Sequence, residues 1–193
     1  TFNASNGSNK SAILFEGGAD NATDLSGFIG GGNLTISGNT ANSKGVFFQF
    51  TNWKLVNNMS LAITDNKVDA FTNKAIALYD MDGAVTASGN EFASVTVNRN
   101  VFTKVPAGRT ILKEYTGTVQ VDASANYLGS GTPDYEALLL GDKVTVDSYY
   151  KDEALTELVK TGLTGSGTEA DPYMINNLEE LILFRDSVNA GET

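Results

Sequence analysis

The sequence predicts an all-β solenoid in which short strands stack into successive coils. Strand-like segments recur with an Asn at their ends: LTISGN, LAITDN, VTASGN, VTVNRN and VQVDASAN, which end at Asn39, Asn66, Asn90, Asn100 and Asn126. Their apolar residues alternate, which gives each strand an inward and an outward face. Most of these Asn residues lie about 24 to 27 residues apart, a spacing that suits one solenoid coil of three short strands. Asn90 and Asn100 lie only 10 residues apart, so one extra Asn is expected inside a coil.

Intermediate strands are expected between the Asn-ended ones, at VFFQF (residues 46–50), AIALYD (75–80) and TILKEY (110–115), with an incoming strand at residues 12–15. Apolar residues two positions after an Asn are expected to return inward: Val68, Phe92, Phe102 and Leu128. The Asn residues themselves have a physical reason, because a sharp corner needs a residue that tolerates the left-handed backbone region. Stacked Asn amides can also hydrogen-bond from coil to coil. The alternative is that these Asn residues end the isolated hairpins of a β-sandwich.

Composition excludes several function classes. Cys and His are both absent from the 193 residues, so there is no disulfide framework, no thiolate metal site and no imidazole base. The formal net charge of −10 argues against nucleic acid and anionic membrane surfaces as partners, because phosphate binding needs clustered Lys and Arg. The longest apolar runs, at residues 137–140 and 181–184, are far shorter than the ~20 residues of a spanning helix, so no membrane insertion is expected in this segment.

Residues 126–150, NYLGSGTPDYEALLLGDKVTVDSYY, carry a family resemblance. An Asn-aromatic pair, a Gly-Ser-Gly-Thr-Pro loop, a short apolar patch and a final strand follow one another. The run resembles the last coil of right-handed parallel β-helix proteins of the pectin-lyase-like superfamily. The resemblance covers residues 34–150 and implies a right-handed parallel β-helix over residues 1–150, with a closing coil at about 119–150.

A different organisation is expected after residue 150. Residues 151–164 are interpreted as a linker with a short helix at 152–159, capped by Asp152. Residues 165–193 are interpreted as the start of a further module, with a strand at 173–175 and an amphipathic helix from about Leu178, capped by Asn177 and Glu180. This stretch resembles a module-opening sequence in large surface proteins of gut bacteria, which implies a multi-module parent. The helix is expected to pack against the last coil or its neighbour through Leu181, Ile182 and Phe184.

The sequence contains few candidates for catalytic or calcium-binding residues. Hydrolases of the superfamily place several Asp near a His and an Arg-x-Lys pair, and this chain has neither. Its lyases use Asp-bound calcium and an Arg or Lys base, which needs no His. The local candidates are Asp80 and Asp82 for calcium, with a base among Lys74, Arg99, Lys104 and Arg109. Two carboxylates are few for calcium, and the ordinary interpretation of DMDG is a solvated turn.

Glycan contacts are the other candidate chemistry. Trp53 and Tyr79 are the aromatic residues expected to be partly exposed, and sugar rings stack on such faces. Arg99 and Arg109 belong to a basic span, with Lys104 and Lys113, that could line a groove for an anionic glycan. The competing interpretations are that Trp53 fills a coil corner and that the basic residues are merely solvated. The tyrosines at 115, 127, 149 and 150 are assigned to packing.

We therefore expect a non-catalytic adhesion or stalk segment, extracellular or at the cell surface, with a glycan or host surface ligand as partner and no resident cofactor. The alternative is a calcium-dependent polysaccharide lyase or an inactive relative. The sequence leaves the ligand and the oligomeric state open.

Overall fold

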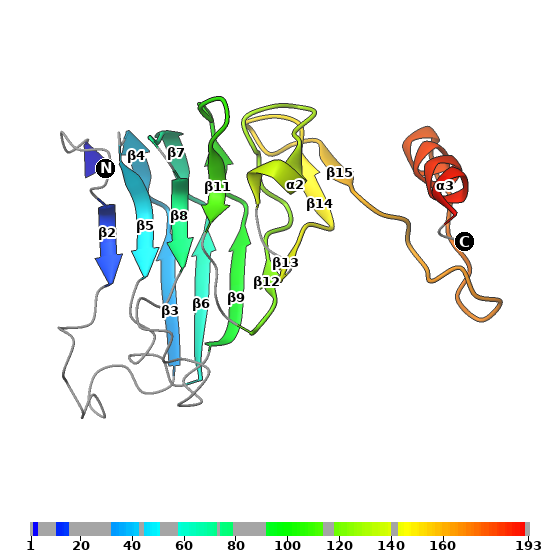
Figure 1. Cartoon of the computed structure of the whole chain (residues 1–193), viewed down its shortest axis with the longest axis horizontal. Helices are drawn as coiled ribbons and strands as arrows, with labels where there is room; N and C mark the ends of the chain where they lie inside the picture. Colours follow the sequence, from blue (N-terminus) through cyan, green and yellow to red (C-terminus); the bar gives the residue numbers. More distant parts are fainter. Residues whose placement is uncertain are drawn as a thin grey trace.

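The computed structural model describes residues 2–3, 11–15, 32–42, 45–50, 58–72, 74–78, 92–113, 118–139 and 143–191. Most described strands belong to three parallel sheets (Figure 1). Sheet A contains β1 (Phe2–Asn3), β4 (Thr40–Asn42), β7 (Lys67–Ala70) and β10 (Val101–Phe102). Sheet B contains β2 (Ser11–Phe15), β5 (Val46–Phe50), β8 (Lys74–Leu78) and β11 (Thr110–Lys113). Sheet C contains β3 (Gly32–Ser37), β6 (Met59–Thr64), β9 (Phe92–Asn98), β12 (Val121–Asp122) and β13 (Val144–Thr145).

The order of these strands along the chain is cyclic. From β1 to β12 the chain visits sheets A, B and C in turn, and each strand pairs in parallel with the strand three elements later. The prediction of a mainly β chain with parallel strands is confirmed. The β-sandwich alternative does not fit, because a sandwich is built from antiparallel neighbours.

Sheet C shows how the sequence pattern sets the register. Leu61 pairs with Leu34 on one side and with Val95 on the other, and Ile63 pairs with Ile36 and Val97. Leu61 and Ile63 are buried while Ser60, Ala62 and Thr64 are less so. The period of two therefore aligns aliphatic side chains of successive strands on one inward face.

The central strands of sheet B, β5 and β8, are buried on both faces, whereas its edge strand β2 is not. In β5 and β8 consecutive residues are inaccessible to solvent, and their sequences are nearly continuous apolar runs, as parallel strands covered on both sides require. The Phe15 ring stacks on Phe50 with 5.6 Å between centroids, and Phe50 meets the edge of Phe92 at the same distance. These contacts join sheets B and C in one core.

The corner between sheets C and A contains a chain of amide hydrogen bonds. Asn39 Nδ2 donates to Asn66 Oδ1 (3.0 Å), Asn66 Nδ2 to Asn100 Oδ1 (2.9 Å), and Asn100 Nδ2 to Asn126 Oδ1 (3.0 Å). Each accepting oxygen also receives the backbone N–H of the donor residue. We call these four residues the Asn ladder. It confirms the predicted coil-to-coil amide contacts.

The ladder includes Asn100, which is bonded to Asn66 across 34 residues, whereas Asn90 lies outside the described residues. One detail of the corner prediction is wrong. The left-handed conformation belongs to the residue before each ladder Asn, namely Gly38, Asp65, Arg99 and Ala125, with φ between 54° and 69°. The Asn residues are retained for their side-chain amides, while the turn is made one residue earlier.

The residues that follow the ladder return inward as predicted. Val68, Phe102 and Leu128, each two positions after a ladder Asn, are buried, and Phe92 is buried at the start of β9. Val68 and Phe102 are paired in register in sheet A. Isolated parallel bridges continue the sheet from Val101 to Tyr127 and from Asn126 to Tyr149.

The end of the stack differs from its middle. Near it, the short helix α2 (Tyr135–Leu138) is capped by Asp134, and the next residue, Leu139, forms a bridge with Leu112 of sheet B. The chain then pairs β14 (Ser148–Tyr150) with β15 (Leu158–Lys160) as an antiparallel hairpin. The predicted helix at 152–159 is wrong. Asp152 instead accepts the backbone N–H groups of Thr156 and Glu157 and holds a hairpin loop.

The C-terminal helix α3 (Leu178–Ala190) has the predicted ends. Asn177 Oδ1 accepts the N–H of Glu180 at 2.8 Å, and Gly191 terminates the helix in the left-handed conformation. The Glu180 carboxylate reaches back to the N–H of Asn176, one residue earlier than a standard capping box. The predicted strand at 173–175 is reduced to a bridge between Met174 and Thr164.

The predicted packing of α3 on the last coil or its neighbour through Leu181 and Ile182 is wrong. An extended segment separates α3 from the three parallel sheets (Figure 1), and Leu181 and Ile182 are 49% and 39% exposed. Phe184 instead meets the Tyr173 ring at 6.1 Å. No helix among the described residues has the length and apolar character needed to cross a membrane.

Candidate functional site

The structure describes the four candidate bases, Lys74, Arg99, Lys104 and Arg109. Trp53, Tyr79, Asp80 and Asp82 lie outside the described residues. Arg99 occupies the corner between β9 and β10, and Arg109 lies directly before β11, after a turn closed by its own N–H to Pro106. Arg99 therefore lies between sheets C and A and Arg109 between sheets A and B, and the two arginines do not form a common site. In the part of the chain that the structure describes, no three acidic side chains gather as a metal site.

Arg99 is held by a carboxylate from the preceding corner. Its Nε donates to Asp65 Oδ1 at 2.8 Å, with both side chains about half exposed. This hydrogen bond and the charge of Asp65 raise the pKa of the Arg99 guanidinium, with a smaller contribution from Tyr150. The guanidinium is thus fixed in its protonated form and has donors left over, because one carboxylate oxygen uses only part of its fork.

Tyr150 interacts with the Arg99 guanidinium, and Tyr127 occupies the position next to Tyr150 on the outer face of sheet A. Asn126 is buried and forms a parallel bridge with Tyr149, which packs against the core. The residues that follow, Tyr127 and Tyr150, project to the opposite, outer face because side chains alternate along a strand. They occupy adjacent positions on neighbouring chain segments, and both are partly exposed. We call Asp65, Arg99, Tyr127 and Tyr150 the Arg99 cluster.

The basic side chains around the cluster are neutralised by carboxylates. Lys67 Nζ lies 3.3 Å from Glu153, Lys104 Nζ lies 3.0 Å from Asp69, and Lys151 Nζ lies 2.7 Å from Glu157. The carboxylate partners of Lys67 and Lys104 come from distant parts of the sequence, which the stacking of parallel strands brings near. The basic span predicted at residues 99–113 is therefore, at Arg99 and Lys104, part of a series of ion pairs.

Sequence reasoning missed the two tyrosines of the cluster by assigning them to packing. The available signal was the alternation itself, because a buried ladder Asn at position 126 places Tyr127 outward. The contact of Arg99 with Tyr150 had no such signal, since it depends on which turns lie next to each other.

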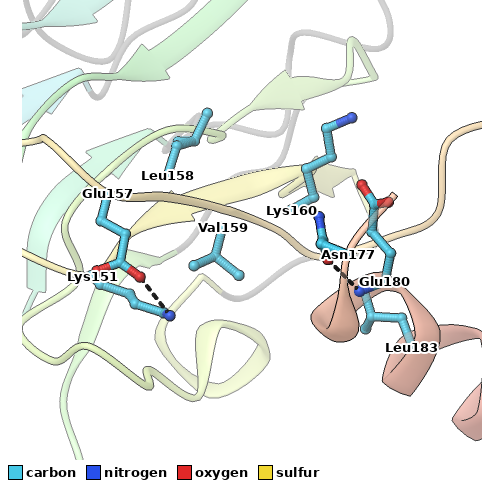
Figure 2. A pocket seen from close by; sticks show the side chains of 8 residues that line it. All are labelled: Lys151, Glu157, Leu158, Val159, Lys160, Asn177, Glu180 and Leu183. Carbon is cyan, nitrogen blue, oxygen red and sulfur yellow. Dashed lines mark hydrogen bonds and ion pairs between the residues drawn. The ribbon is translucent and has the colours of Figure 1, made fainter. Parts of the chain in front are cut away.

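A second candidate is a cleft between the β14–β15 hairpin and α3. It has a volume of 180 Å³ and is lined by the side chains drawn in Figure 2: Lys151, Glu157, Leu158, Val159, Lys160, Asn177, Glu180 and Leu183. Its polar groups already bond one another, as in the Lys151–Glu157 and Asn177–Glu180 pairs (Figure 2). The cleft therefore offers a mixed surface with few unengaged groups.

Neither the models of protein families, nor the curated proteins, nor the solved structures contain a match to this chain. The site has to be judged from its own geometry.

Proposed function

We propose that the three sheets form the faces of one right-handed parallel β-helix of the pectin-lyase-like kind. The cyclic visiting order of sheets A, B and C supports this, as does the Asn ladder that joins four successive corners. Residues 1–150 supply the coils in this proposal, residues 151–164 a linker, and residues 165–193 the start of a further module of a bacterial multi-module surface protein.

The proposed function is a non-catalytic adhesion or stalk segment that lies outside the cell or at its surface and carries a glycan-binding face. The observation that carries it is the continuous stacking of parallel strands on an unbroken set of corner amides. Each coil contacts only its neighbours, so the stack can act as a stiff spacer whose outer faces are free for display. The outward tyrosines of the Arg99 cluster are a suitable surface for a sugar ring.

The alternative, a calcium-dependent polysaccharide lyase, is less well supported. A lyase base must give up a proton to start the reaction, whereas Asp65 raises the pKa of Arg99. Lys104 likewise pairs with Asp69. The chain also has no His to take the role. In this alternative, Asp80 and Asp82 are the proposed calcium ligands.

A glycan array probed with the whole 193-residue chain tests the proposal, together with an absorbance assay for unsaturated uronate product. We expect retention on at least one glycan and no product, with or without calcium. Product that requires calcium and disappears in Asp80→Ala would establish the lyase instead. Absence of retention on every glycan would contradict the glycan-binding part of the proposal.

A further inference from the structure

We propose that the Arg99 cluster binds an uncharged pyranose sugar, and that it discriminates against uronates and other anionic glycans. This inference rests on the proposed glycan-binding function and adds the site and the ligand class.

The basic side chains on and near the Arg99 cluster are paired with carboxylates. Arg99 is paired with Asp65, and the lysines at 67, 104 and 151 are each paired with a carboxylate. An anionic ligand would have to compete with Asp65 for the guanidinium, on a chain whose formal net charge is −10. Coulomb repulsion and the loss of an existing ion pair both oppose such a ligand.

The Asp65–Arg99 pair has both hydrogen-bond donors and hydrogen-bond acceptors. A guanidinium has five N–H donors and a carboxylate has two acceptor oxygens, and the Asp65–Arg99 contact joins only Nε to Oδ1. Tyr150 takes a further share of the guanidinium donors. Donors of Arg99 and an oxygen of Asp65 still lie side by side with capacity to spare. Two neighbouring hydroxyls of a sugar, each a donor and an acceptor, match such a pair.

The rings of Tyr127 and Tyr150 supply the apolar surface of the cluster. Tyr127 and Tyr150 occupy adjacent outward positions and are partly exposed, whereas Val101, which pairs with Tyr127, is buried beneath this row. Aromatic rings with a polar tip combine a large contact area with a hydroxyl. The C–H face of a pyranose can lie on this row while its hydroxyls reach the Asp65–Arg99 pair.

The test is binding of the whole chain to an array that contains neutral and anionic glycans, followed by titration of the best neutral oligosaccharide. We expect binding to neutral glycans that changes less than about twofold between low and physiological salt, because no net charge is neutralised. Tyr150→Ala and Tyr127→Ala should each weaken it at least about tenfold. The matched control is Tyr173→Ala, which removes an equal ring far from the cluster and should leave binding unchanged.

Two further variants keep the inference testable if a tyrosine variant fails to fold. Arg99→Gly suits a backbone with φ of 55° and should fold, yet should lose binding at least about tenfold. Asp65→Asn also suits its left-handed backbone, and it releases the charge of Arg99. It should gain affinity for anionic glycans that falls as salt is raised.

The outcomes separate the two proposals. Binding of anionic glycans only by the wild-type chain would overturn the ligand class and leave glycan binding standing. Neutral binding that survives all three loss variants, Tyr127→Ala, Tyr150→Ala and Arg99→Gly, would overturn the site. No binding to any glycan would overturn the proposed function as well.

Discussion

Asn66 donates its side-chain N–H to the Oδ1 of Asn100 across 2.9 Å, although 34 residues separate them. Asn66 also donates to the carbonyl of Ile36, on the other side of the same corner. Each buried amide thus uses both its donor and its acceptor along the stack, and no polar atom of the ladder interior is left without a partner. The ladder is the most regular polar feature of the described fold.

Asn100→Ala should lower the free energy of unfolding by about 3 kcal/mol. The substitution removes the acceptor of the backbone N–H and of one of the two side-chain N–H groups of Asn66, and it removes the side-chain donor to the carbonyl of Ile63, all in a buried environment. Urea denaturation measures the effect. Asn39→Ala is the control, since Asn39 is only half-buried at the end of the ladder, and should cost about 1 kcal/mol. Similar small losses in both variants would show that the ladder contributes little.

Ala125→Gly should raise stability by up to about 1 kcal/mol, because a non-Gly residue pays steric energy in the left-handed region and Gly does not. Ala123→Gly is the matched control. Ala123 is fully buried and has no such backbone, so that variant should be destabilised. Equal destabilisation of both variants in thermal unfolding would argue that the corner at 125 carries no strain.

These two features show what the sequence could and could not predict. The strands, their alternation and the amide contacts follow from local pattern. The partner of Asn66 does not, because Asn90 and Asn100 carry the same signal and only the length of the intervening coil selects between them. The left-handed positions could not be predicted either. Gly38 is a residue type that favours this conformation, but Asp65, Arg99 and Ala125 share no property that would indicate it.

The C-terminal errors have a similar cause. Leu155, Leu158 and Val159 have helical spacing, yet Leu155 adopts a left-handed backbone and the Asp152 carboxylate captures N–H groups in a hairpin loop. The antiparallel pairing of β15 with β14 outweighed the helical propensity of this segment. The Arg99 cluster escaped prediction because it joins residues from four successive turns of the chain.

Acid should destabilise the fold through Asp69 and Asp152. A hydrogen bond from Thr103, followed by one from Lys104, lowers the pKa of Asp69, and the N–H of Glu157 is the main cause that lowers the pKa of Asp152. Their stabilising contribution is complete above the ordinary value of 3.8 and is lost as the pH falls through the lower folded-state pKa values.

We therefore expect the free energy of unfolding to drop below about pH 4, and to drop less in Asp69→Asn/Asp152→Asn. Thr103→Val, which removes the main cause at Asp69, should reduce the drop in part. Urea denaturation between about pH 2 and pH 7 measures it. An identical pH profile in the wild type and the double variant would refute this assignment.

Gly165→Ala should unfold the loop that precedes α3. An added Cβ would lie 2.2 Å from the carbonyl oxygen of Pro172, and the φ of 98° is strained for any L side chain. Hydrogen exchange should show loss of protection at Met174, whose N–H bonds Thr164. Gly162→Ala, which meets nothing within 4 Å, should leave protection unchanged. Equal protection in the two variants would exclude the close approach.

Disulfide trapping tests the parallel stacking of coils most directly, because the chain contains no Cys of its own. Ser60 pairs with Ser94 and Thr64 with Asn98 in register, at a strand spacing that suits a disulfide. Cysteine pairs placed at 60 and 94, and separately at 64 and 98, should oxidise readily in the folded protein. Rapid oxidation of the crossed pairs, 60 with 98 and 64 with 94, would mean antiparallel neighbours and would contradict the fold described above.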